Sequence, residues 1–222
     1  MQKLVLFDFD GTLADTAPDL AATANEMRAL KGLPPLPYEH LRPQASKGAR
    51  GLLKASLDMD PDHPEYEAHR IQFLDLYAQQ LTQHTTLFPG VPQLLSTLTE
   101  NGYKWGIVTN KIEALALPIV RHFQLDLECA VTVGGDTVGV AKPHPAPLLH
   151  AAQQVGVAPH SCLYIGDDER DIVAGKAAGM PTVAAAYGYC QVDDIPRWNA
   201  DAVVHAAGEI WPVVQALFKQ AA

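Results

Sequence analysis

The stretch Leu4–Asp15, LVLFDFDGTLAD, sets the expected fold of the chain. Its first four residues form a short apolar run that predicts a strand buried in the core. The run ends on Asp8 and Asp10, which are two residues apart and therefore face the same side of an extended chain. Two carboxylates at the end of a buried strand are costly unless a cation or a shared proton offsets their burial. Gly11 then lets the backbone turn tightly and leaves room for a ligand. For this stretch alone, a strand followed by an acidic turn without function is the alternative.

The composition is that of an ordinary soluble protein. Of the 222 residues, 48% are hydrophobic and 18% are charged, a balance typical of globular domains. The net charge of −9 argues against nucleic acid or an anionic membrane as the main partner. No run approaches the ~20 apolar residues of a membrane span. The chain also reaches Asp8 too early for the apolar region of a signal peptide.

Cysteine and histidine usage adds two expectations. The three cysteines are far apart, odd in number and without a C-x-x-C pair, which is typical of reduced thiols in a cytoplasmic protein. The nine histidines show no spacing of the zinc-binding kind. We therefore expect a cytoplasmic protein without a zinc site.

The hydrophobic pattern divides the chain into two parts. Residues 16–86 show helical spacings and no convincing strand. From Gly90 onward, apolar strands alternate with helical segments, which favours a mainly parallel sheet with helices on both faces. Because the first strand belongs to that sheet, we predict an α/β, Rossmann-like core domain of residues 1–15 and 87–222. An all-helical cap domain of residues 16–86 interrupts it.

Helices and strands can be placed approximately. In the cap, helices are expected from Pro18 to Leu30, over 38–57 with a break near Ser46, and over 65–83. The apolar positions expected to mark the buried side of the last helix are Ile71, Leu74, Tyr77, Ala78 and Leu81. In the core, strands are expected at 103–108, 130–133, 162–165, 182–186 and 202–204.

Polar residues follow the expected core strands, at the edge where an open parallel sheet binds its ligands. Thr109 and Asn110 follow one strand in WGIVTNK, and a hydroxyl with backbone N–H groups at a helix start can bind an anion. A simple helix cap is the alternative for this pair. Lys142 lies in VAKPHPAP, where three prolines hold the backbone in a fixed loop. Because this loop is rigid, we expect Lys142 to bind a phosphate and a carboxylate rather than to lie on the surface in contact with solvent.

The string GDDERD, residues 166–171, repeats the logic of the first motif. Asp167 follows a strand and a glycine, and Asp171 lies one helical turn further on. The two acidic residues between them, Asp168 and Glu169, suit the start of a helix, where negative charge interacts favourably with the helix dipole. Asp8, Asp10, Asp167 and Asp171 cannot all stay ionised together without a cation, and oxygen ligands of this kind suit Mg²⁺.

The string DFDGT resembles the first motif of the haloacid dehalogenase superfamily of phosphohydrolases, and the other strings follow in that family's order. The resemblance implies an aspartyl-phosphate intermediate on Asp8, with Asp10 as general acid and then general base. It implies that Gly11, Thr12, Thr109, Asn110 and Lys142 bind the phosphoryl group. It also implies Mg²⁺ on Asp8, the backbone carbonyl of Asp10 and Asp167, with Asp171 acting through water or on Lys142.

Within the superfamily, the whole pattern is similar to phosphoglycolate phosphatases, so a small phosphate ester is the expected partner. Surface strings such as DMDPDHP, FLDLY and TLFPG look closer to N-acetylmuramic acid 6-phosphate phosphatases of cell-wall recycling. A sugar phosphomutase similar to β-phosphoglucomutase would share every core residue named above. A non-catalytic phosphate-binding protein is the alternative outside enzymes. The oligomeric state is not readable from the sequence.

The cap contains one candidate specificity loop. Residues 46–50, SKGAR, interrupt the helical pattern and resemble the family's substrate-specificity loop. Lys47 and Arg50 are therefore candidate ligands for an anionic group on the leaving part of the substrate. A basic surface turn is the alternative.

Overall fold

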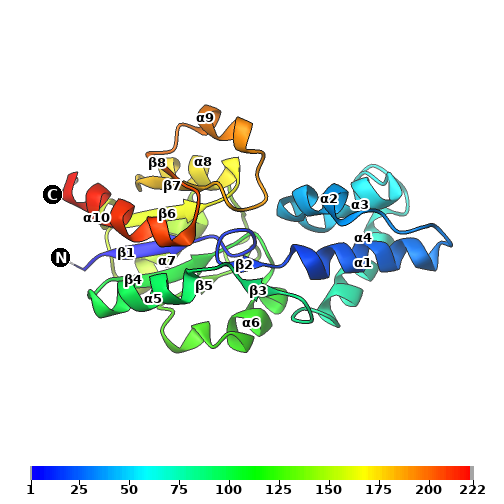
Figure 1. Cartoon of the computed structure of the whole chain (residues 1–222), viewed down its shortest axis with the longest axis horizontal. Coiled ribbons are helices and arrows are strands. Elements are labelled where there is room, and N and C mark those ends of the chain that lie inside the picture. The colour runs from blue at the N-terminus through cyan, green and yellow to red at the C-terminus, as the bar shows by residue number, and fades with distance from the viewer. Residues whose placement is uncertain (1, 221–222) are drawn as a thin grey trace. The chain divides into compact units, whose positions relative to one another are not determined.

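The computed structural model describes residues 2–220, and the chain forms two compact units (Figure 1). The α/β unit comprises the described residues of the segments 1–14 and 87–222. The helical unit comprises Asp15–Thr86. Residues 1, 221 and 222 of the expected core domain lie outside the described residues. Among the residues that are described, no helix has the length and apolar character needed to cross a membrane.

In the described part of the α/β unit, six strands form one parallel sheet in the order β5-β4-β1-β6-β7-β8. The strands are β1 (Leu4–Phe7), β4 (Lys104–Val108), β5 (Thr132–Val133), β6 (Cys162–Gly166), β7 (Thr182–Ala185) and β8 (Ala202–Val204). Strand β1 pairs with β4 on one side and β6 on the other, so the strand order reverses at β1. Ligands bind at the carboxyl edge of such a switch point. Asp8 therefore stands where the topology places a site.

Helices flank this sheet on both faces (Figure 1). They are α5 (Val91–Glu100), α6 (Glu113–His122), α7 (Ala146–Val155), α8 (Glu169–Ala177), α9 (Ile195–Trp198) and α10 (Ile210–Gln220). Short 3₁₀ turns lie at Leu125–Leu127, Pro159–Ser161, Val192–Asp194 and Ala207–Glu209. The expected α/β class with a mainly parallel sheet is confirmed.

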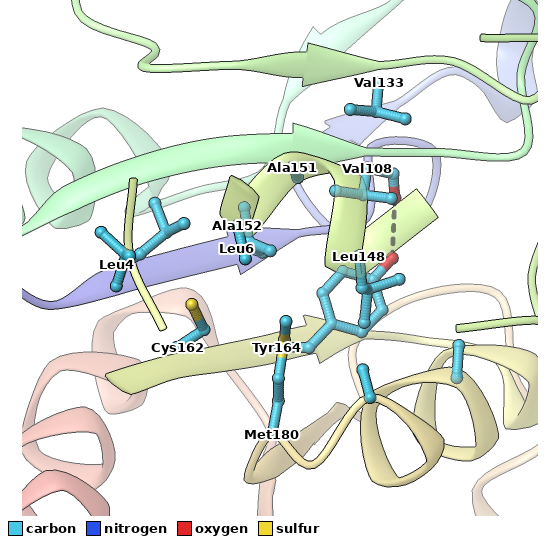
Figure 2. Packing of buried hydrophobic residues seen from close by; sticks show 13 residues of the cluster. Leu4, Leu6, Val108, Val133, Leu148, Ala151, Ala152, Cys162, Tyr164 and Met180 are labelled. Carbon is cyan, nitrogen blue, oxygen red and sulfur yellow. Dashed lines mark hydrogen bonds between the residues drawn. The ribbon is translucent and has the colours of Figure 1, made fainter. Parts of the chain in front are cut away.

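One face of the sheet packs against α7 and α8 (Figure 2). Leu4 and Leu6 project to this face, since alternate residues of a strand share a side. They meet Leu148 of α7 and the ring of Tyr164 from β6, all fully buried. This apolar layer fixes the strand ends from which the polar site residues project.

The helical unit contains α1 (Ala17–Leu30), α2 (Tyr38–Leu41), a 3₁₀ turn (Arg42–Lys47), α3 (Gly48–Leu57) and α4 (Tyr66–Ala78). The chain segments joining the two units are β2 (Ala14–Asp15) and β3 (Thr86–Leu87), which pair with each other. Asp19 is fully buried in α1, and its carboxylate accepts hydrogen bonds from the backbone N–H groups of His84 and Thr85, both at 2.9 Å. The last residues of the unit are thus tied to its first helix.

The expected helix over 65–83 was too long, and its buried face was partly wrong. Helix α4 ends at Ala78, and turns follow it. Its buried residues are Tyr66, Phe73 and Tyr77, which recur at helical spacing. Ile71 is 49% exposed because it lies off that stripe.

Candidate active site

Asp8 directly follows β1 and lies at the centre of the carboxyl edge. Its backbone N–H donates to Ile165 O at 2.8 Å, which continues the pairing of β1 with β6. Its Oδ1 lies 2.9 Å from Nζ of Lys142, yet this buried oxygen accepts no hydrogen bond of good geometry. Burial raises the pKa of Asp8 to about 7, and the charge of Lys142 opposes this rise. The carboxylate is therefore buried with less positive charge around it than its ionised form needs.

Lys142 connects the carboxylates of the site to the sheet. Its side chain is 2% exposed, and its ammonium donates to Val108 O at 3.0 Å, Tyr164 Oη at 2.6 Å and Asp171 Oδ1 at 2.7 Å. Burial by itself would lower the pKa of Lys142, but the facing carboxylates of Asp171 and Asp8 raise it above its ordinary value. The lysine is thus held as a cation.

Asn110 fixes the backbone of Lys142. Its amide accepts from Lys142 N at 2.9 Å and donates to Lys142 O at 3.0 Å. The peptide bond between Lys142 and Pro143 is cis. Asn110 therefore supports the base from which the lysine side chain extends, and its expected contact with phosphate remains a prediction.

Asp167 closes the site from β6 and is 1% exposed. Thr12 Oγ1 donates to its Oδ1 at 3.0 Å, and the N–H of Tyr189 donates to its Oδ2 at 2.8 Å. A Cβ on Gly11 would come within 2.2 Å of Asp167 Oδ2, and one on Gly188 within 2.3 Å of Asp167 Cβ. Both positions need glycine because the carboxylate occupies the space of their side chains.

Asp171 has a supporting role at the start of α8. Its Oδ2 accepts from Asp168 N at 3.0 Å, and Asp168 in turn caps the helix through Arg170 N, which makes a capping box. A Cβ on Gly166 would lie 2.2 Å from Asp171 Oδ2. The expectation that the acidic residues between Asp167 and Asp171 begin a helix is confirmed.

Three carboxylates form a cluster with the chemistry of a metal site. Ligand oxygens of Asp8, Asp167 and Asp171 lie within 4.8 Å of one another. Burial first, and then the neighbouring Asp8 and Asp171, raise the pKa of Asp167 well above its ordinary value. Asp171 already faces the ammonium of Lys142, which disfavours a second cation on that oxygen. Asp8 also faces Lys142, at 2.9 Å, so one ammonium serves two of the three carboxylates. Clustered hard oxygen donors with this excess of negative charge fit a divalent cation of the Mg²⁺ type, and Asp8 and Asp167 as its ligands remain a prediction.

The sequence interpretation did not include Lys111 or Tyr164 among the site residues. Lys111 Nζ donates to both carboxylate oxygens of Asp10, at 2.9 and 3.2 Å. Tyr164 Oη donates to Val108 O at 2.7 Å (Figure 2) and accepts from Lys142. Burial raises the pKa of Tyr164 well above 10.0, which keeps the phenol protonated as a donor. The signal for Lys111 was its position, three residues after the end of β4.

Thr109 lies at the carboxyl edge of the sheet, whereas Lys47 and Arg50 lie in the helical unit. Thr109 is 3% exposed, and its Oγ1 accepts from Lys111 N at 3.1 Å. The α/β unit thus brings Thr12, Thr109, Asn110 and Lys142 to the same edge of the sheet as Asp8 and Asp10. Lys47 and Arg50 belong to the helical unit, where both are exposed and Lys47 Nζ donates to Gln44 Oε1 at 3.2 Å.

Comparison with known proteins gives a consistent picture. The family model described as "Haloacid dehalogenase-like hydrolase" matches residues 5–185. A phosphoglycolate phosphatase of Xanthomonas campestris is 47% identical over 210 residues, covering 94% of this chain and 95% of that protein. An N-acetylmuramic acid 6-phosphate phosphatase of Pseudomonas aeruginosa is 42% identical over 213 residues, covering 96% and 94%. The crystal structure of a predicted phosphoglycolate phosphatase from Haemophilus somnus has a TM-score of 0.84 and 29% identity, covering 96% of this chain and 98% of that one.

Proposed function

The chain belongs to the haloacid dehalogenase-like hydrolase family, and we propose that it is a Mg²⁺-dependent phosphatase of small phosphorylated metabolites. It would act through an aspartyl-phosphate intermediate on Asp8. The observation that carries this proposal is the buried contact of Asp8 with Lys142, beside the carboxylates of Asp167 and Asp171. In this proposal Asp8 is the nucleophile, Lys142 supplies the cationic charge, and the clustered carboxylates supply the metal ligands.

In the first half of the reaction, Asp8 attacks phosphorus in line with the leaving group. A bond forms between the carboxylate oxygen and phosphorus, the ester P–O bond breaks, and Asp10 gives its proton to the leaving oxygen. In the second half, Asp10 takes a proton from water, and that water attacks the phosphorus of the aspartyl phosphate. Inorganic phosphate leaves, and Asp8 is restored.

Charge decides whether the first step can begin. A carboxylate about 4 Å from a phosphate dianion is repelled by about 4 kcal/mol per charge pair at an effective dielectric of 20. Lys142 opposes this repulsion, and we assign it, with Thr109, to the phosphoryl oxygens that carry the developing charge. We assign Asp8, the backbone carbonyl of Asp10 and Asp167 as ligands of Mg²⁺, which when bound supplies the remaining positive charge.

Phosphoglycolate is our leading substrate, since a relative named phosphoglycolate phosphatase matches nearly the whole chain at 47% identity. N-acetylmuramic acid 6-phosphate is the second candidate, supported by the relative at 42% identity. The helical unit would serve as a cap that limits the substrate to a small molecule. The net charge of −9 argues against a nucleic-acid partner. The three free cysteines support a cytoplasmic enzyme.

The test is turnover of p-nitrophenyl phosphate, phosphoglycolate, N-acetylmuramic acid 6-phosphate and hexose phosphates, with Mg²⁺ and with a chelator. We expect hydrolysis that the chelator abolishes and that added Mg²⁺ restores. Asp8→Asn should lose at least about 10³-fold in kcat while remaining folded, because the nucleophile is gone.

Three results would each reject a part of this proposal. No metal-dependent turnover of any ester would favour a phosphate-binding protein without catalysis. A clear preference for the amino-sugar phosphate would replace phosphoglycolate as the substrate and leave the mechanism unchanged. Isomerisation of a hexose phosphate without release of phosphate would identify a mutase.

A further inference from the structure

Lys111 is a buried lysine at the site for which the proposed mechanism has no role. Its side chain is 7% exposed, and that of Asp10 is 16% exposed. A buried ammonium keeps its charge only where hydrogen bonds replace its hydration. Both oxygens of the Asp10 carboxylate provide such bonds, although 101 positions separate the two residues in the sequence.

The backbone of Lys111 is anchored on two sides. Its N–H donates to Thr109 Oγ1 at 3.1 Å, and its carbonyl accepts from Gly135 N at 2.8 Å. A Cβ on Gly135 would lie 2.3 Å from Asn110 O, so the two loops pack as closely as glycine allows. The side chain of Lys111 therefore starts from a fixed point, and its reach to Asp10 is built into the fold.

Each carboxylate of the first motif has its own lysine. Asp8 contacts Lys142 at 2.9 Å, and Asp10 contacts Lys111 at 2.9 Å. Neighbouring carboxylates that shared one cation could exchange contacts with it. Separate lysines keep the nucleophile and the proton-transfer group in separate positions.

We propose that Lys111 is a positioning residue that fixes the orientation of the Asp10 carboxylate for proton transfer to the leaving group. The terminal torsion of an aspartate is broad when nothing restrains it. Proton transfer requires the acid oxygen within about 2.6–3.2 Å of the reacting oxygen. Contacts to both oxygens remove that freedom. This inference rests on the proposed function, because it assumes that Asp10 transfers the proton.

Two other roles for Lys111 predict different kinetics. A lysine that binds the transferring phosphoryl group would affect every ester equally and would also bind inorganic phosphate. A lysine that only fills space would lower the Tm and would reduce turnover of all substrates in parallel. A positioning role acts through Asp10 alone, so it matters most where the leaving group needs a proton.

The experiment compares phenyl phosphate with p-nitrophenyl phosphate, which have similar shapes but differ in how much the leaving oxygen needs protonation. Lys111→Met should lower kcat/KM at least about tenfold for phenyl phosphate, since general acid catalysis contributes about 10²–10⁴-fold. The loss should be smaller for the nitrophenyl ester, and inhibition by inorganic phosphate should be unchanged. Lys111→Arg should recover most of the activity. Lys104→Met, at the opposite end of β4 and exposed, is the matched control.

A double-mutant cycle separates this inference from the proposed function. In an Asp10→Asn background, Lys111→Met should have no further effect on phenyl phosphate. Equal losses for the two esters, weaker inhibition by phosphate, or additivity in that background would overturn the positioning role. If Asp10→Asn alone keeps full activity, the assignment of Asp10 fails first. Lys111→Gln, which retains a donor without charge, replaces the Met variant should the latter not fold.

Discussion

The two units of the molecule use the same charged residue types in opposite ways. In the α/β unit, Lys142 and Asp171 pair at 2.7 Å with side chains 2% and 1% exposed. In the helical unit, Lys54 pairs with Asp58 at 2.6 Å, with side chains 49% and 88% exposed. Distance alone does not distinguish the pairs, but burial does. Exposed pairs are screened by solvent and contribute little, whereas buried charges depend strongly on every neighbour.

The difference in burial explains why the candidate active site lies in the α/β unit. Burial raises the pKa values of Asp8 and Asp167, which leaves the carboxyl edge short of positive charge. Under the proposed function, a cation and a phosphate ester would bind there together, because each balances charge that the other adds. The exposed charges of the helical unit are already satisfied by water and by each other.

The largest contrast between the units should appear in their response to Mg²⁺ and pH. The folded metal-free protein holds a proton on Asp8 up to about pH 7, whereas an unfolded aspartate releases it near its ordinary pKa of 3.8. The folded state therefore binds more protons in this interval, and stability falls as the pH rises from about 4 to about 7. Mg²⁺ replaces the proton, so it should stabilise more at pH 7.5 than at pH 5.

Calorimetry measures this effect. At about 100 times its Kd, Mg²⁺ should add about 2.7 kcal/mol, or roughly 5–11 °C in the melting of the α/β unit at pH 7.5. Asp167→Asn should remove most of this shift, and Asp60→Asn in the helical unit should leave it intact. A shift that is independent of pH, or one retained by Asp167→Asn, would contradict the assigned ligands.

A smaller effect is expected from the basic turn of the helical unit. If Lys47 and Arg50 contact an anionic group on the substrate, Lys47→Met and Arg50→Met should lower kcat/KM a few-fold for phosphoglycolate. p-Nitrophenyl phosphate, which carries no carboxylate, should be hydrolysed as before. Lys54→Met is the control, since its partners Asp58 and Asp60 are exposed. Equal behaviour of all three variants would show that the turn is only a solvated surface.

Much of the candidate site could be predicted because several of its residues come directly after a strand in the sequence. Asp8 and Asp167 were expected together from the rule that ligands bind at the carboxyl edge of a parallel sheet, and Lys142 was expected there from its proline-rich loop. The membership of the haloacid dehalogenase-like family that the DFDGT string suggested is confirmed. The parallel sheet was predictable because apolar strands alternate with helical segments along the chain.

The features that the sequence did not predict have physical explanations. A lone lysine such as Lys111 is usually a surface residue, and only the folded loop shows it 7% exposed beside Asp10. Tyr164 sits within an apolar strand, so the sequence indicates a packing role and gives no sign of its hydroxyl contacts. Helix α4 ends at Ala78 because packing of its aromatic stripe, rather than helix propensity, sets its length.

The most direct test of the account is to trap the phosphorylated enzyme. Wild-type protein is mixed with substrate and Mg²⁺, quenched within one turnover, reduced with borohydride, and analysed by peptide mass spectrometry. An acyl phosphate on Asp8 would convert that residue to homoserine, and Asp8→Asn would give no such product. Conversion at Asp10 instead, or none at all in an enzyme that is turning over, would contradict the assignment of Asp8 as the nucleophile.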